Sequence, residues 1–179
     1  MQSLKSKLSA PVLLALALAA PSVASAADMA KLDEEVIAAL NNCIDVSESC
    51  AERQLDAEGV LVFPDVLSVE LGVGGAGGHG ALVQNGAVTG HYSLGEATAG
   101  LEAGIDVASY IFVIETPEAL EKIESGKWSV GADAGITVVD GATAKAESTA
   151  DVYTYVVGSR GLDANIAVDV LRIWPDQEG

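Results

Sequence analysis

Basic residues are scarce in this sequence. Nine lysines and arginines stand against 26 aspartates and glutamates, and the formal net charge is −17 at pH 7. Proteins that bind nucleic acid neutralise its phosphates with a basic surface, so this composition excludes nucleic acid as the partner. The same negative charge opposes simple electrostatic attraction to anionic lipid. A strongly acidic composition indicates a well-solvated surface.

Residues that bind metals or act as nucleophiles are also few. The chain has two histidines, His79 and His91. Asn85 and Gly86 lie between short apolar runs, which favours a two-residue hairpin turn. With such a turn, the two imidazoles point to opposite faces of the hairpin, whereas a three-residue turn would reverse this. We therefore expect no bound metal and no cofactor.

Catalytic motifs are missing as well. The sequence contains no G-x-S-x-G, no H-E-x-x-H and no calcium-loop spacing. Glu102 and Asp106 share a strand face, but four residues along a strand separate two side chains by roughly 13 Å. That distance is too long for a pair of carboxylates in acid–base catalysis. We expect the protein not to be an enzyme.

The first 26 residues have the features of a secretory signal peptide. Lys5 and Lys7 precede an apolar run over residues 10–20, and small residues occupy 24–26. The run is too short to cross a bilayer as a helix, and no later run reaches that length. We predict a leader over residues 1–26 and one domain over 27–179, exported to the periplasm or the medium. Losing the two leader lysines leaves seven basic against 26 acidic residues, or −19.

The two cysteines, Cys43 and Cys50, predict a disulfide. Disulfides persist in exported proteins. In one continuous helix, seven residues would separate the two cysteines by roughly 10 Å, too far for a bridge. However, the Asn-Asn pair at 41–42 indicates a helix end, and Ser49 followed by Glu52 indicates the start of another helix. A turn between two helices brings the thiols together, with two buried free thiols as the alternative.

Hydrophobic periodicity predicts an α+β fold. The segment "MAKLDEEVIAALNN" is amphipathic at helical spacing, and a second helix follows over about residues 50–58. A later helix begins at Thr116 and Pro117 and ends before Gly126. We expect a strongly curled antiparallel sheet or partly closed barrel, two short N-terminal helices and one helix inserted between strands. The predicted strands cover residues 59–64, 66–75, 96–115, 128–140, 150–158 and 162–174, with a tight turn at "GSRG" (158–161).

Glycines gather between residues 72 and 80. Three of them spell G-x-G-x-x-G, but no helix follows, and a nucleotide-binding loop needs one. Alternate strand residues share a face, so the even positions of 70–80 and 100–108 leave two nearly bare faces. Such faces let a sheet coil sharply, or they form a shallow groove for an acyl chain. The groove would include Gly72, Gly74, Gly78, Gly100 and Gly104.

Five segments together resemble the SYLF domain family in order and spacing. They are "GVLVFPDV", "GVGGAGGHGALV", "ATAGLEAGIDVASYIFVIETPEALEKI", "WSVGADAGITVV" and "ADVYTYVVGSRGLDANIAVD". The resemblance covers about Leu32 to Trp174. Eukaryotic SYLF proteins are associated with phosphoinositide membranes and actin regulation, bacterial relatives are exported proteins or lipoproteins, and none is known as an enzyme. Arg160 matches a position of the "G-x-[KR]-G-L" turn that is commonly basic in the family, which adds it to the groove.

The chain departs from the eukaryotic members in its charge. Their basic N-terminal helix is replaced here by a segment in which Lys31 stands among acidic residues. The resemblance therefore implies an exported, non-enzymatic SYLF-like domain that binds lipid or an envelope component by peripheral contact. Phosphatidylinositol binding is implied at the level of the family, and the acidic charge of this chain opposes it. The alternative is a structural or protein-interaction module of the cell envelope with no small ligand.

Overall fold

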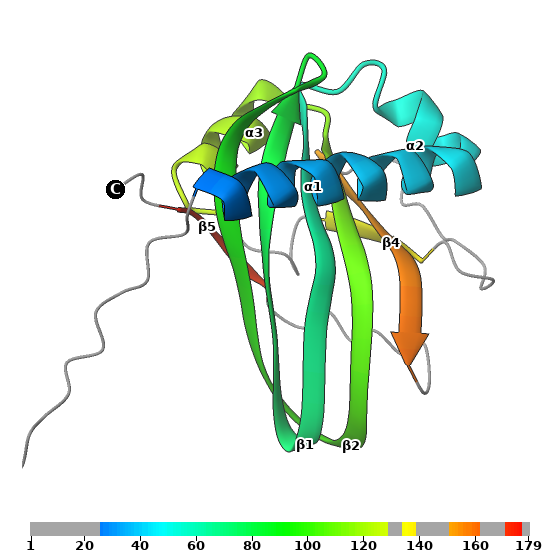
Figure 1. The fold of residues 1–179 in the computed structure, drawn as a ribbon, viewed down its shortest axis with the longest axis vertical. Helices are drawn as coiled ribbons and strands as arrows, with labels where there is room; N and C mark the ends of the chain where they lie inside the picture. Colours follow the sequence, from blue (N-terminus) through cyan, green and yellow to red (C-terminus); the bar gives the residue numbers. More distant parts are fainter. Residues whose placement is uncertain (1–25, 129–133, 139–150, 162–170, 177–179) are drawn as a thin grey trace, which may run out of the picture.

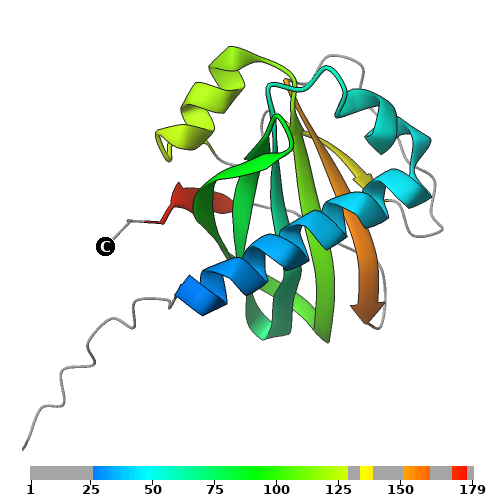
Figure 2. The ribbon, with the colours of Figure 1, turned by 45° about the horizontal axis from the view of Figure 1, so that its top comes forward.

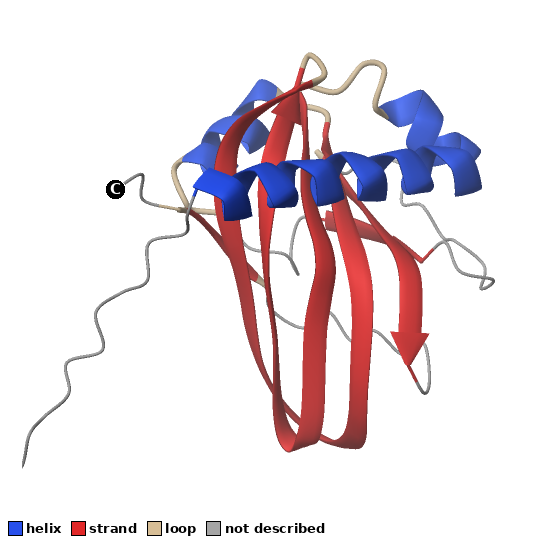
Figure 3. Ribbon diagram, in the orientation of Figure 1, coloured by secondary structure: helices blue, strands red, loops and turns tan. Residues whose placement is uncertain are grey.

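The computed structural model describes residues 26–128, 134–138, 151–161 and 171–176. One sheet of five strands lies between helices (Figures 1 and 3), which confirms the α+β class. The predicted leader lies outside the described residues except for Ala26. The elements in chain order are α1 (Ala26–Val46), α2 (Glu48–Arg53), β1 (Gly59–Gln84), β2 (Ala87–Ile114), α3 (Pro117–Glu124), β3 (Ala134–Val138), β4 (Val152–Gly161) and β5 (Arg172–Pro175).

A long antiparallel ribbon of β1 and β2 forms most of the sheet. The two strands are joined by a two-residue turn at Asn85 and Gly86, as the sequence predicts. Both turn residues have positive φ angles, 51° and 77°, as a hairpin turn of this length requires. β4 pairs with the end of β2, β3 pairs with β4, and β5 pairs with residues 92–95 of β2.

The ribbon folds back on itself, so that the two halves of β1 lie side by side (Figures 1 and 2). The bend falls at a register shift between Leu71 and Val73. A Cβ placed on Gly80 would lie 2.1 Å from the carbonyl oxygen of Val62 in the other half of β1. No side chain fits in that space, so glycine is needed where the two halves approach.

The two faces of the sheet carry separate hydrophobic cores. On one face, α1 packs Val36 and Leu40 against a group that includes Val62, Ile111 and Tyr155. We call this the α1-side face. On the opposite face, α3 and Trp128 pack against aromatic residues of β1 and β2. There the Phe112 ring meets those of Phe63 and Trp128 edge to face, with ring centroids 6.0 and 5.5 Å apart.

The two N-terminal helices start and end at residues other than those predicted. α1 has 21 residues and continues through the Asn-Asn pair at 41–42, so it is not short. Its apolar side keeps contact with the sheet as far as Cys43, and this packing outweighs the helix-end signal. The N-cap of α2 is Ser47 rather than Ser49, because the Ser47 hydroxyl accepts the Cys50 N–H. The predicted cap of α3 is confirmed: Thr116 accepts the Ala119 N–H, and proline follows it.

Three expectations about the strands are wrong. β1 does not stop at Pro64, because a bulge between Phe63 and Val66 accommodates a residue without an N–H. The "GSRG" segment lies inside β4, where Gly158 has a φ of 69° at another register shift. β3 and β4 pair in parallel, so the sheet is not wholly antiparallel. Among the strands that the structure describes, the sheet is open and no barrel closes.

Candidate functional site

α1 covers one end of the sheet face on which it packs, and β1 and β2 continue beyond it (Figure 1). On this part of the α1-side face, Leu67 pairs with Val107 and Val69 pairs with Ile105. Leu67 is 47% exposed and Ile105 is 65% exposed, while the two valines are partly buried. We call these four residues the uncovered apolar face. Adjacent exposed apolar residues on regular strands indicate a contact surface, unlike single exposed ones.

Strand alternation explains why these residues point away from the core. Val66 and Ala108 are buried in the core on the opposite face, so their neighbours Leu67 and Val107 point to the α1 side. Ile111 lies on the same side as Val107 but is fully buried under α1. The difference between a buried and an exposed residue on this face is therefore set by where the helix lies.

The second half of β1 adds a flat glycine surface to the same face. Counting alternate residues from Ala81, which packs beneath α1, Gly77 and Gly75 point to the α1 side. Gly77 is exposed, and the nearest atom to a Cβ there would be the Leu94 oxygen at 3.8 Å. Gly95, the partner of Gly77, is covered by Trp174, whose ring would lie 2.9 Å from a Cβ at that position. The missing side chain thus leaves the face open at Gly77 and makes room for the Trp174 ring at Gly95.

One ion pair borders the uncovered apolar face, and a second lies on α1. Arg160 pairs with Val107 in register, so it shares that face, and its Nη2 donates to Asp65 Oδ1 at 3.0 Å. Their side chains are 75% and 61% exposed. On α1, Lys31 donates to Glu35 at 2.6 Å. That hydrogen bond and the Glu35 charge raise the pKa of Lys31, and Asp65 adds to the effect. Arg160 at the border and Lys31 on α1 are thus each paired with a carboxylate.

The six residues predicted for the glycine groove do not share one face. Gly74, Gly78 and Gly104 are on the face opposite α1, whereas Arg160 lies on the α1 side. Gly72 and Gly100 fall in the register shift at the bend. A Cβ on Gly78 would meet Val66 at 3.0 Å, so this glycine serves the fold-back of the ribbon, while Gly104 has nothing within 4 Å.

The glycine faces predicted from the sequence lie at even positions of the ribbon, and the uncovered apolar face lies at odd ones. The signal was present, because Leu67, Val69, Ile105 and Val107 alternate as a strand pattern requires. Alternation identifies an apolar face but not whether a helix covers it.

The two histidines lie on the same face, which contradicts the expectation of opposed imidazoles. A bulge near Leu82 inserts one extra residue into β2. His79 therefore pairs with Ser93 instead of Tyr92, and a shift of one residue exchanges the two faces. The two-residue turn was correct, but the bulge that follows it cannot be read from the turn sequence.

The histidines make two separate polar contacts. His91 Nε2 lies 2.8 Å from Asp33 Oδ1 and connects β2 to α1. His79 Nδ1 lies 3.1 Å from the Ser93 hydroxyl, which donates to Asp176 Oδ1 at 2.6 Å. A serine nucleophile needs its proton directed to the histidine, with the carboxylate on the other ring nitrogen, and here the carboxylate takes the serine proton. Within the described ranges, no three His, Cys, Asp or Glu side chains are grouped to hold a metal ion.

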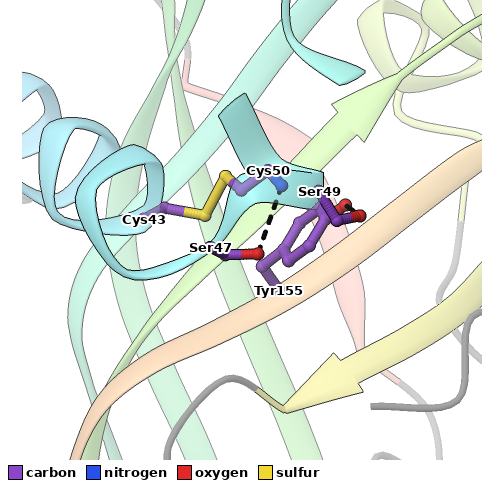
Figure 4. Close-up of a disulfide and its surroundings, with 5 residues drawn as sticks. All are labelled: Cys43, Ser47, Ser49, Cys50 and Tyr155. Carbon is purple, nitrogen blue, oxygen red and sulfur yellow. Dashed lines mark hydrogen bonds between the residues drawn. A yellow bond between two sulfur atoms is a disulfide. The ribbon is translucent and has the colours of Figure 1, made fainter. Parts of the chain in front are cut away.

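The predicted disulfide is confirmed (Figure 4). Cys43 near the end of α1 and Cys50 in α2 are joined with an S–S distance of 2.02 Å, and their Cα atoms are 6.1 Å apart. Both cysteines are fully buried. The neighbouring Ser49 hydroxyl lies 2.8 Å from the hydroxyl of Tyr155 in β4. The disulfide and this hydrogen bond hold α2 against both α1 and the sheet.

A polar pocket of about 470 Å³ lies beside α2. The Arg53 guanidinium in this pocket lies 3.4 Å from the centroid of the Tyr153 ring and forms an ion pair with Glu115. Its charge is therefore already used in fixing α2 to the sheet. The lining residues are Ser49, Glu52, Arg53, Asp56 and Glu115.

The comparisons with known proteins agree with the resemblance found in the sequence. In the described residues, no helix combines the length and apolarity needed to cross a bilayer. No curated protein matches the chain. A family model described as "Ysc84: Las17-binding protein actin regulator" matches residues 95–179, a range that includes Ile105, Val107 and Arg160. Residues 95–179 are thus similar to the Ysc84 family, in agreement with the SYLF resemblance of the sequence.

Proposed function

We propose that this protein is an exported, non-enzymatic SYLF domain that binds a lipid surface through the uncovered apolar face. The observation that carries the proposal is the exposure of Leu67 and Ile105, diagonal neighbours on two paired strands. Burying an aliphatic side chain of this size contributes about 1.5–3 kcal/mol. A few such residues give reversible peripheral contact rather than permanent insertion.

Two further features support export and peripheral contact. The predicted leader would direct the chain out of the cytoplasm. Outside the cytoplasm, a disulfide such as Cys43–Cys50 persists. The net charge of −17 makes attraction to an anionic surface unfavourable, so contact must come from apolar burial.

The test is co-sedimentation of the purified protein with net-neutral phosphatidylcholine vesicles. The double variant Leu67→Ser/Ile105→Ser should bind at least about tenfold more weakly, because two apolar contacts are removed. Leu55→Ser is the matched control, since Leu55 is 80% exposed but follows α2, away from the uncovered apolar face. The control should bind like the unchanged protein, and circular dichroism should show that all variants fold.

Two results would count against the proposal. Unchanged binding of the double variant would place the lipid contact elsewhere. Absence of binding to any vesicle would reject lipid as the partner and favour a structural or protein-interaction module.

A further inference from the structure

We infer that the lipid recognised by the uncovered apolar face carries a zwitterionic headgroup, with its phosphate bound by Arg160 and its ammonium group by Asp65. This inference rests on the proposed function and specifies the chemical class of its ligand. It begins from the ion pair at the border of the apolar residues, where Arg160 and Asp65 are in contact at 3.0 Å.

The Arg160–Asp65 pair can exchange partners at little cost. Both side chains are mostly exposed, and an exposed ion pair contributes about 0–1 kcal/mol. Arginine presents a planar fork of donors that matches two phosphate oxygens. A phosphate that reaches Arg160 gains a stronger contact than the solvated carboxylate that it replaces.

The backbone of Asp65 is held in place, so its carboxylate can bind the ammonium group of the lipid once Arg160 has turned to the phosphate. It lies in the bulge of β1 with a φ of 47°, a conformation that Asp and Asn tolerate better than most residues. Its backbone N–H donates to the Ser109 hydroxyl at 3.3 Å, which ties the bulge to β2. The carboxylate therefore remains beside the apolar residues after its partner has changed.

Charge complementarity favours a zwitterion over an anionic lipid. At the border, Arg160 has Asp65 as its carboxylate partner, so the surface offers one positive and one negative charge beside apolar residues. A zwitterionic phospholipid offers the same combination: acyl chains, one phosphate and one ammonium group. An anionic headgroup would leave Asp65 facing negative charge without compensation.

The experiment compares two kinds of net-neutral vesicle, because the overall charge of the protein then affects both equally. One is phosphatidylcholine, and the other is digalactosyldiacylglycerol, whose headgroup carries no charge. The unchanged protein should bind phosphatidylcholine about fivefold more tightly. Arg160→Gln and Asp65→Asn should each reduce this preference to near unity while leaving binding to the sugar lipid unchanged.

Matched controls come from α3, which packs on the opposite face. Lys122→Gln and Glu118→Gln remove the same charges at exposed positions and should keep the fivefold preference. Equal binding of the unchanged protein to both vesicles, or a preference that survives both Arg160→Gln and Asp65→Asn, would overturn the headgroup inference but leave lipid binding intact. Failure to bind either vesicle would instead reject the proposed function.

Discussion

At the residue scale, glycines in the same ribbon have different roles. Gly80 allows the two halves of β1 to approach, because a Cβ there would lie 2.1 Å from Val62 O and 2.6 Å from the Phe63 ring. Gly104 has no atom within 4 Å of the same position. The need for glycine therefore depends on what lies beside each position, which the sequence does not reveal.

The first prediction tests this difference by substitution. Gly80→Ala should lower the free energy of unfolding by about 3 kcal/mol, because backbone and a buried ring must both move. Gly104→Ala should change it by less than about 0.5 kcal/mol. Urea denaturation of both variants checks the prediction. Similar losses for the two variants would contradict the fold-back of the ribbon.

The second prediction concerns Tyr92, which is buried in the core opposite α1. Burial raises the pKa of its phenol above the ordinary value of 10.0, and the negative charge of Glu124 raises it further. The neutral phenol is thus favoured in the folded state, and above pH 10 the unfolded chain releases this proton more readily. The free energy of unfolding should therefore fall as pH rises through 10 and beyond.

Tyr92→Phe should weaken that alkaline fall, since phenylalanine does not titrate. Chemical denaturation at pH 8 and at pH 10.5 measures the effect in both proteins. An identical pH dependence of the variant and the unchanged protein would exclude Tyr92 as its source.

At the scale of elements, the disulfide fixes α2 to α1 and so supports the packing of Arg53 on Tyr153. Replacing both cysteines by alanine should lower the free energy of unfolding by about 2.5 kcal/mol on the chain-entropy estimate for so short a loop. Denaturant unfolding gives the value. Intact-mass analysis after alkylation under denaturing conditions without reductant should show no added label, and two added labels would contradict the bond.

Local signals predicted several elements correctly. Thr116 followed by Pro117 marked the start of α3, and Asn85-Gly86 marked the hairpin turn. These signals are reliable because they depend on neighbouring residues alone: a hydroxyl that accepts an N–H three residues on, or a backbone that reaches positive φ. The disulfide prediction was also correct, although the signals behind it placed the end of α1 and the start of α2 at the wrong residues.

Long-range effects limited the rest of the prediction. Pro64 is an apparent strand end, but a bulge paired with β2 keeps it inside β1. Because of the bulge near Leu82, His79 lies on the same face as His91, whereas opposite faces were expected. Both bulges depend on the partner strand, so the sequence of β1 alone does not specify them. The uncovered apolar face was missed for a similar reason, since it depends on where α1 crosses the sheet.

At the scale of the whole molecule, a strongly negative chain carries one apolar surface that is bordered by an ion pair. The net charge is −17, yet at the border of the uncovered apolar face Arg160 is paired with the carboxylate of Asp65. α1 buries one end of the α1-side face, and beyond it, where no described helix lies, Leu67 and Ile105 are exposed (Figure 2). A membrane would therefore be met by the free end of the ribbon, with the helices directed away from it.

The most direct measurement of this claim places an environment-sensitive fluorophore on the surface itself. The native cysteines are paired, so Ile105→Cys labelled with nitrobenzoxadiazole carries a single probe. On addition of phosphatidylcholine vesicles, its emission should increase and shift to the blue as the probe enters the bilayer. The same probe on Leu55→Cys, which is exposed after α2, should not respond. A blue shift at residue 55, or no change at residue 105 while the protein sediments with the vesicles, would contradict the account.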